Sequence, residues 1–262
     1  MICAGIDAGS RAIKVVLIDA DSLEIVGRGL ADQGVEQDKL AAGLFKKVLK
    51  SNGATAKDVA AIVATGYGRT AVSIADTTIT EITCHAVGVH RLVPKARTVI
   101  DIGGQDSKLV RLDGAGKVRD FAMNDRCAAG TGRFLEVTAK RLGVELDALG
   151  RLAAKSRTPA AISSMCVVFA ETEITGLLAC GTDREDIVAG VQAAIASRIV
   201  AMAGRNIEPP IVFTGGVAMV SGMTAALKTA LGQAVTVAPE PQMTGALGAA
   251  ILASKRLHGA TA

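Results

Sequence analysis

Ile6-Asp7-Ala8-Gly9 and Ile100-Asp101-Ile102-Gly103 are two copies of one short motif, starting at positions 6 and 100. Each copy is followed by a lysine, an aliphatic run and a second aspartate at the same offsets. This pattern predicts a β-hairpin with a carboxylate at the end of its first strand. Three residues that match at the same spacing favour an internal duplication over chance. The matched residues are Asp7, Lys14 and Asp19 in the first copy and Asp101, Lys108 and Asp113 in the second.

The composition is that of a chain with a large aliphatic core. Of its 262 residues, 50% are apolar, yet only five Phe and one Tyr are aromatic, beside 46 Ala and 29 Gly. This length and composition predict one large or two small domains and exclude disorder. The scarcity of aromatic side chains argues against single-stranded nucleic-acid binding, which uses aromatic stacking. The net charge of +4 is spread along the chain, so we expect no nucleic-acid partner.

Targeting and redox features predict a reduced, cytoplasmic protein. No uninterrupted apolar run approaches the length of a membrane span, and Asp7 interrupts the apolar start before a signal sequence forms. The five cysteines are an odd number and make no disulfide framework. We therefore expect them to be core residues, reactive thiols or metal ligands.

Strands alternate with helices along the rest of the chain, which predicts an α/β fold made of two related domains. Helical periodicity and capping residues define the helices, and short apolar runs define the strands. Outside the hairpins, the expected strands are 60–64 and 211–213, and the expected helices are 38–52, 132–142, 169–179, 185–205 and 245–257.

Three Gly-rich turns follow predicted strands: Asp7-Ala8-Gly9-Ser10, Asp101-Ile102-Gly103-Gly104-Gln105 and Thr214-Gly215-Gly216. Glycine permits positive φ and lets backbone amides surround an anion closely. One such turn is typical of an ordinary hairpin, but three, two of them duplicated, favour nucleotide binding. Neither a Walker A nor a Rossmann glycine motif occurs in its required context, which disfavours those folds.

Charged residues beside these turns suggest how a nucleotide is held. A carboxylate repels phosphate but holds Mg²⁺ through water, because Mg²⁺ keeps much of its hydration shell. Asp7 and Asp101 fit this role, whereas Ser10 and Lys14 fit phosphate contacts. Gln105 positions the attacking water or only lines the site, and the sequence favours neither reading. The candidate catalytic residues are therefore Asp7, Asp101 and Gln105.

In these features the sequence resembles the acetate/sugar kinase, actin and chaperone-ATPase superfamily. The resemblance implies duplicated RNase H-like domains with an interdomain ATP cleft, the first of residues 1–96 plus about 245–262, the second of 97–244. It implies two phosphate loops, Asp7–Lys14 and Asp101–Ser107, and an adenosine loop, Thr214–Val217. The predicted nucleotide contacts are Gly9, Ser10, Arg11, Lys14, Gly103, Gly104, Gln105, Asp106, Gly215, Gly216 and Gln242.

The cysteines divide into two groups. Cys3, Cys84 and Cys180 lie in apolar stretches and are predicted to be buried core residues. Cys127 and Cys166 each lie just ahead of a predicted helix, where free amides and the helix dipole stabilise a thiolate. Two thiolates do not complete a four-thiolate iron–sulfur cluster, but a symmetric dimer supplies four. Spacing alone leaves the metal and the structural interpretations of this pair open.

Several longer strings resemble one family, the activators of 2-hydroxyacyl-CoA dehydratases and the ATPase subunits of ATP-dependent benzoyl-CoA reductases (BadF/BadG/BcrA/BcrD-type ATPases). The resemblance covers nearly the whole chain. The strings that carry it are Ala64–Arg69, Ile79–Ala86, Val99–Asp106, Asn124–Leu135, Val168–Glu171 and Gly245–Ala250.

The resemblance implies a homodimer, or a heterodimer with a related subunit, that holds one [4Fe–4S] cluster through Cys127 and Cys166 of both subunits. It implies that reduced ferredoxin or flavodoxin supplies electrons and that ATP with Mg²⁺ changes the domain angle. The acceptor is then a dehydratase or reductase that works on an acyl-CoA thioester. An oxygen-sensitive cluster implies an anaerobic cytoplasm.

This chain departs from the family pattern in places. Arg11 follows Ser10 where the family usually has Thr, which puts one phosphate contact in doubt, and Met165 and Val167 flank Cys166 where small polar residues are frequent. Glu171 and Glu173 are expected to stabilise the start of their helix rather than to act in catalysis. The string Pro239–Gly245 slightly favours the benzoyl-CoA reductase subunits over the dehydratase activators. The three histidines, expected not to be ligands, are His85, His90 and His258.

Two other functions share these sequence features. One is a small-molecule kinase of the same fold with Asp101 as general base, although 262 residues leave little room for a sugar pocket. The other is a non-redox nucleotide switch or chaperone-like module in which both cysteines are structural.

Overall fold

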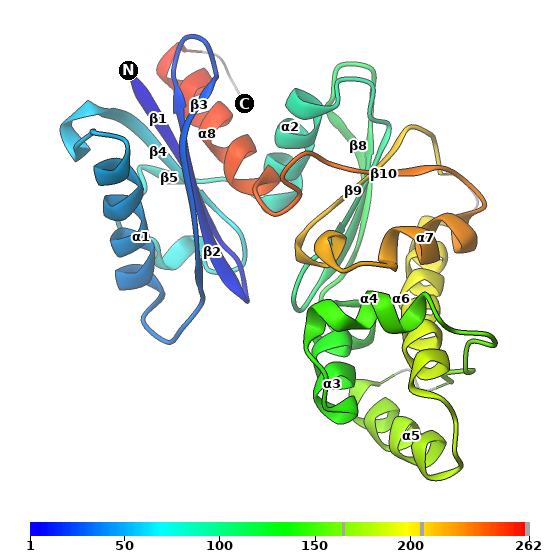
Figure 1. The fold of residues 1–262 in the computed structure, drawn as a ribbon. Helices are drawn as coiled ribbons and strands as arrows, with labels where there is room; N and C mark the ends of the chain where they lie inside the picture. The colour runs from blue at the N-terminus through cyan, green and yellow to red at the C-terminus, as the bar shows by residue number, and fades with distance from the viewer. Residues whose placement is uncertain (164–165, 205–206, 260–262) are drawn as a thin grey trace. The chain divides into compact units, whose positions relative to one another are not determined.

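The computed structural model describes residues 1–163, 166–204 and 207–259. The chain forms two compact units (Figure 1). The first unit consists of Met1–Ala96, Leu112–Arg119 and Ala238–Ala262, and the second of Arg97–Arg111 and Asp120–Val237. Each unit is built on one five-stranded mixed sheet.

The sheet of the first unit has the order β3-β2-β1-β4-β5. β1, β2 and β3 pair antiparallel, and β4 and β5 add in parallel beside β1. The register places Asp7 opposite Lys14, which confirms the first predicted hairpin. The strands are β1 (Ile2–Ala8), β2 (Ala12–Asp19), β3 (Ile25–Asp32), β4 (Val59–Thr65) and β5 (Thr77–Thr78).

Helices cover both faces of this sheet because β1 and β2 are apolar on both sides. α1 (Gln37–Ser51) packs on the face that carries Ile6, and α8 (Thr244–Leu257) packs on the face that carries Cys3. α2 (Glu81–Leu92) lies against α8. Since side chains alternate along a strand, Asp7 belongs to the face covered by α8. Short 3-10 turns at Ala56–Asp58 and Arg69–Ala71 complete the unit.

α2 and α8 meet backbone to backbone through two glycines. A Cβ atom on Gly88 would overlap the carbonyl oxygen of Thr244, and one on Gly248 would overlap that of Cys84. Any larger residue at either position therefore forces the helices apart. This approach brings the start of α8 beside α2, close to the end of β1.

The sheet of the second unit repeats this topology, with the order β10-β9-β6-β7-β8. β6 pairs antiparallel with β7 and parallel with β9, and Asp101 lies opposite Lys108. The second predicted hairpin and the duplicated α/β fold are thus confirmed. The strands are β6 (Thr98–Ile102), β7 (Ser107–Leu112), β8 (Val118–Asn124), β9 (Ile211–Thr214) and β10 (Val235–Val237).

The third matched aspartate has a local role in each copy. Asp19 Oδ1 accepts hydrogen bonds from the backbone N–H groups of Asp21 and Ser22, at 3.1 and 3.0 Å. Asp113 Oδ1 accepts from Ala115 and Lys117, at 2.8 and 2.9 Å. The bonds from the backbone N–H groups lower the pKa of Asp19 below its ordinary value. These carboxylates close the turns to β3 and β8 and so belong to the hairpin scaffold.

The units differ most between the third and fourth strands of each sheet. Residues 33–58 connect β3 to β4, whereas the much longer stretch 125–210 connects β8 to β9. This stretch contains Cys127, Cys166 and most helices of the unit. Its 3-10 turns are Ala128–Gly130 and Leu146–Ala148, and a third, Gly216–Met219, follows β9. The helices of the unit are α3 (Gly132–Leu142), α4 (Leu149–Ala153), α5 (Val167–Ala179), α6 (Arg184–Ala203) and α7 (Met223–Leu231).

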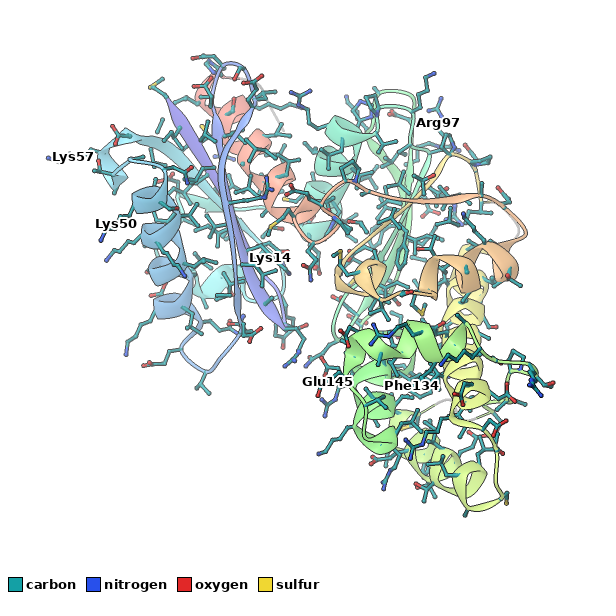
Figure 2. All side chains as sticks on the ribbon, in the orientation of Figure 1. Lys14, Lys50, Lys57, Arg97, Phe134 and Glu145 are labelled. Carbon is teal, nitrogen blue, oxygen red and sulfur yellow. The ribbon has the colours of Figure 1, made fainter. Side chains whose placement is uncertain are left out.

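α6 is the central helix of the second unit. Its buried residues pack in one apolar core with Phe134 of α3, which Figure 2 labels, and with the face of the sheet that carries Ile100. α6 is long and apolar enough to span a membrane by length and composition alone, and half of its most apolar window is buried inside the protein. Core helices of soluble proteins pass the same test, so this is weak evidence for a span. The predicted helix end at Arg205 lies outside the described residues.

Replacing Gly248 by Ala tests the backbone contact between α2 and α8. The added methyl group would overlap the Cys84 carbonyl oxygen, and overpacking of this kind costs about 1–3 kcal/mol. Gly43→Ala is the matched control, because Gly43 is an exposed helical glycine with nothing within 4 Å of its Cβ position. This control should gain about 0.4–1 kcal/mol. Urea unfolding followed by circular dichroism measures both, and equal stability of the two variants would contradict the packing described.

Candidate functional site

The first hairpin ends in a partly buried ion pair. Lys14 Nζ lies 3.1 Å from Asp7 Oδ2, and the Lys14 side chain, labelled in Figure 2, is 17% exposed. Between them, the Gly9 N–H donates to the Ala12 carbonyl at 3.1 Å and closes a tight turn. A carboxylate that is almost fully buried needs such a partner, since an unpaired buried charge is strongly destabilising.

Gln33, just after β3, holds this turn from outside. Its side-chain Nε2 donates to the Gly9 carbonyl at 2.8 Å, and its backbone N–H donates to the Arg11 carbonyl at 2.9 Å. The sequence offers no motif that marks Gln33. The two bonds fix the shape of the turn that carries Ser10, which is half-buried, and Arg11, which is exposed.

The second hairpin repeats the ion pair and adds a second carboxylate. Lys108 Nζ lies 3.2 Å from Asp101 Oδ2 and 2.9 Å from Asp106 Oδ2, and its side chain is only 2% exposed. In the first hairpin the position matching Asp106 is Ala12. Lys108 is therefore fixed between two carboxylates, whereas Lys14 has one carboxylate partner and reaches the surface.

A glycine with positive φ lies against the side chain of each of the two aspartates, Asp7 and Asp101. Gly66, after β4, has φ +88°, and Gly215, after β9, has φ +89°. A Cβ atom on Gly66 would overlap Asp7 Oδ1, and one on Gly215 would crowd Asp101 Oδ1. Thr65–Gly66 is thus the counterpart of Thr214–Gly215, so the duplication extends to a fourth turn. The third predicted Gly-rich turn lies directly beside the second aspartate.

A buried histidine and threonine lie near Asp7. His85 Nδ1 is 3.0 Å from Thr244 Oγ1, which donates to the Pro241 carbonyl at 3.4 Å. A Cβ atom on Gly245 would lie 3.2 Å from both Asp7 Oδ2 and His85 Nε2. A side chain in place of Gly245 would therefore press on both Asp7 and His85. Sequence reasoning left His85 aside as a non-ligand and missed this neighbourhood.

The remaining predicted nucleotide residues lie on the same turns or just before α8. In the second unit, Gly103 and Gly104 are half-buried and Gln105 is exposed. Gly216 opens the 3-10 turn that follows β9. Gln242 belongs to the first unit and is half-buried, two residues before α8. Their nucleotide-binding roles remain predictions.

Cys127 and Cys166 both begin helical segments of the second unit. Cys127 is the N-cap of the 3-10 turn that leads into α3, and Cys166 is the exposed N-cap of α5. Asn124 grips the Cys127 peptide: its Oδ1 accepts from the Cys127 N–H at 3.1 Å, and its Nδ2 donates to the Cys127 carbonyl at 2.7 Å. Both thiols lie outside the fully buried core. Met165, one of the predicted neighbours, lies outside the described residues.

The other three cysteines do not behave alike. Cys3 and Cys84 are fully buried, as predicted, and burial raises the pKa of the Cys84 thiol to about 12. Cys180 is exposed, so its prediction as a core residue is wrong. The reason is that Cys180 caps the C-terminus of α5, and little of that helix is buried.

Glu171 and Glu173 were expected to stabilise the start of α5, and this prediction is wrong in its detail, because neither lies in the first turn. Glu171 instead pairs with Arg141 at the end of α3, at 2.7 Å. Glu173 accepts from the backbone N–H and hydroxyl of Ser163, at 2.9 and 2.7 Å. The two carboxylates tie α5 to α3 and to the segment before Cys166.

The two candidate thiols fit the donor chemistry of an iron–sulfur cluster. In residues 1–163, 166–204 and 207–259, no group of three or more His, Cys, Asp or Glu side chains is arranged to hold a metal ion. Cys127 and Cys166 are two soft thiol donors outside the core of one unit. Iron–sulfur clusters are commonly held by four thiolates, and Cys127 and Cys166 have the chemistry of such ligands.

The duplicated sheets with their paired Gly-rich turns have the actin-like, sugar-kinase-like ATPase fold. A ROK family glucokinase from Streptomyces griseus has this fold, with a TM-score of 0.62 at 14% identity over 97% of this chain and all of that one. Residues 4–253 match the BadF/BadG/BcrA/BcrD ATPase family. The chain belongs to that family.

Relatives align over nearly their whole length. The activator of lactoyl-CoA dehydratase from Anaerotignum propionicum is 45% identical over 97% of both chains. The (R)-2-hydroxyglutaryl-CoA dehydratase activating ATPase from Acidaminococcus fermentans is 44% identical over 96% of both. A benzoyl-CoA reductase subunit from Thauera aromatica is 33% identical over 95% of this chain and 92% of its own. Identity is thus higher to these dehydratase activators than to the reductase subunit.

A solved structure also matches this chain over nearly its whole length. The activator of the 2-hydroxyisocaproyl-CoA dehydratase from Clostridium difficile, solved with bound ADPNP, has a TM-score of 0.93 and 39% identity. The match covers 99% of this chain and 96% of that one.

The two lysines should respond differently to replacement by methionine. Lys108→Met leaves Asp101 and Asp106 without their shared cation in a buried site, and breaking a buried pair costs about 3–5 kcal/mol. Lys14→Met removes a partner that is more exposed and should cost less. Urea unfolding midpoints of both variants measure the difference, and a larger loss for Lys14→Met would contradict the asymmetry of the two hairpins.

Proposed function

We propose that this protein is an ATP-hydrolysing activator that passes a low-potential electron to an enzyme acting on acyl-CoA thioesters. The observation that carries the proposal is full-length identity of 44–45% to two dehydratase activators, in a chain that places two thiols at helix starts outside its core. When bound, a [4Fe–4S] cluster supplies one-electron transfer at low potential.

The proposed nucleotide site uses the duplicated turns. The Gly-rich turns at Gly9 and at Gly103–Gly104 surround phosphate oxygens, and Asp7 and Asp101 hold Mg²⁺ through its water shell. Lys14 is the phosphate-binding lysine, because it has a single carboxylate partner and reaches the surface. Lys108, enclosed by two carboxylates, keeps the second turn in shape. Gly215, Gly216 and Gln242 contact the adenosine.

The proposed assembly is a dimer in which each copy of the chain contributes Cys127 and Cys166 to one [4Fe–4S] cluster. Val168 and Phe169, in the first turn of α5, are each 69% exposed in the single chain. Large apolar side chains exposed beside an exposed thiol are typical of an interaction surface. A two-fold axis near Cys166 would cover them and bring four thiolates together.

The proposed partners follow from this chemistry. Reduced ferredoxin or flavodoxin donates one electron to the activator, and the activator passes it to the acyl-CoA enzyme. ATP drives the transfer if it prefers one conformation of the protein, and hydrolysis then resets that conformation. We favour a 2-hydroxyacyl-CoA dehydratase over a benzoyl-CoA reductase as the acceptor, because identity to the two dehydratase activators is higher. Such a protein works in an anaerobic cytoplasm.

Serine variants test the ligand assignment. Cys127→Ser and Cys166→Ser should each abolish the iron and acid-labile sulfide of the anaerobically reconstituted protein, because a hydroxyl is a poor ligand for this cluster. ATP binding, measured by calorimetry, should persist in both. Cys180→Ser is the matched control, since Cys180 is also exposed on the second unit, and its iron content should equal that of the unsubstituted protein. Unchanged iron in either ligand variant would refute the assignment.

A further inference from the structure

The second Gly-rich turn, at Gly103–Gly104, is hydrogen-bonded directly to the start of α3. The Gly132 N–H donates to the Gly103 carbonyl at 2.9 Å, and the Arg133 N–H donates to the Gly104 carbonyl at 2.9 Å. The first N–H groups of a helix have no partner within the helix. Here the turn carbonyls accept from two of them, all inside the second unit.

Packing at this contact leaves little room for a side chain. A Cβ atom on Gly132 would lie 3.1 Å from the Gly103 oxygen, 3.2 Å from Val217 Cγ2 and 3.4 Å from Gly104 Cα. A side chain at position 132 would therefore press on the turn. Because two hydrogen bonds join the turn to the helix, a displacement of Gly103–Gly104 moves the first turn of α3 or breaks these bonds.

The same helix start is bonded back toward Cys127. Thr131, fully buried, is the N-cap of α3: its hydroxyl accepts from the Arg133 N–H at 3.3 Å and donates to the Ala128 carbonyl at 2.6 Å. Ala128 directly follows Cys127, and Asn124 fixes the Cys127 peptide on both sides. Hydrogen bonds thus connect the turn, through Thr131 and the Ala128 carbonyl, to the backbone beside Cys127.

Among the described residues of the first unit, no backbone hydrogen bond joins the Gly9 turn to the start of α1. There the carbonyl of Gly9, which corresponds to Gly103, accepts from the Gln33 side chain. The next helix, α1, begins at Gln37 with Glu36 as its N-cap, and Gly9 makes its other turn bond to Ala12. The link from turn to helix is thus a feature of the unit that carries both candidate ligands.

We propose that the Asn124–Arg133 segment transmits the nucleotide state of the Gly103–Gly104 turn to the Cys127 thiol, with Thr131 and Gly132 as positioning residues. The inference rests on the proposed function, because it takes this turn to bind phosphate. A nucleotide that prefers one arrangement of the turn then biases the arrangement of Cys127 within a single unit. This coupling between the turn and Cys127 takes place within one chain.

Site-resolved alkylation of iron-free protein tests this link without cluster activity. Iodoacetamide labelling of Cys127, followed by mass spectrometry, is measured with and without Mg-ADPNP. In the unsubstituted protein the nucleotide should change the Cys127 rate by about fivefold or more, the lower end of ordinary coupling between sites. Cys180, exposed at the end of α5, is the internal reference and should not respond.

Variants separate the link from general effects on the fold. Thr131→Val keeps the side-chain shape but removes the hydroxyl, and should bring the response of Cys127 close to none, whereas Thr131→Ser should restore it. Gly132→Ala forces the turn and helix apart by a few tenths of an ångström and should weaken the response. Gly43→Ala, on the exposed side of α1, should leave it unchanged.

Calorimetric titration with Mg-ADPNP distinguishes a failure of the proposed function from a failure of this inference alone. No nucleotide binding by the unsubstituted protein overturns the proposed function and this inference with it. Nucleotide binding with an unchanged Cys127 rate overturns the inference alone. A full response in folded Thr131→Val and Gly132→Ala also overturns it.

Discussion

The ion pair between the aspartate that ends a strand and the lysine opposite it is the contact on which the candidate site depends. In each unit it holds a carboxylate almost out of water at the end of the first strand. A left-handed glycine, Gly66 or Gly215, then comes close enough to exclude any side chain. The hairpin register places the aspartate opposite the lysine, so the pair lies directly beside the Gly-rich turn.

Duplication followed by divergence accounts for the division of labour that we propose. The first unit keeps a short connection after its third strand and a lysine that reaches the surface. The second unit encloses its lysine between two carboxylates and uses its longer connection to carry both candidate cluster ligands. In this account, the turn that meets phosphate is also the support of the helix that follows Cys127.

The two hairpins and their aspartate–lysine pairs could be predicted from the sequence because the residues that form each pair are close together along the chain. The offset of seven between Asp7 and Lys14 is a local hairpin property, and so is its copy at Asp101 and Lys108. Gln33 and the pair His85–Thr244 could not be predicted, since they meet the site only through tertiary packing. Cys180 was misassigned because an apolar helix is usually buried, and α5 leaves most of its residues exposed or half-exposed.

We propose that this ATPase holds one iron–sulfur cluster between two copies of the chain. The most direct measurement is iron and acid-labile sulfide content, with an optical spectrum and molecular mass, on protein purified and reconstituted without oxygen. A cluster shared between two chains should give a brown dimer with four irons and four sulfides for every two chains. A colourless, iron-free protein that still binds ATP would contradict it.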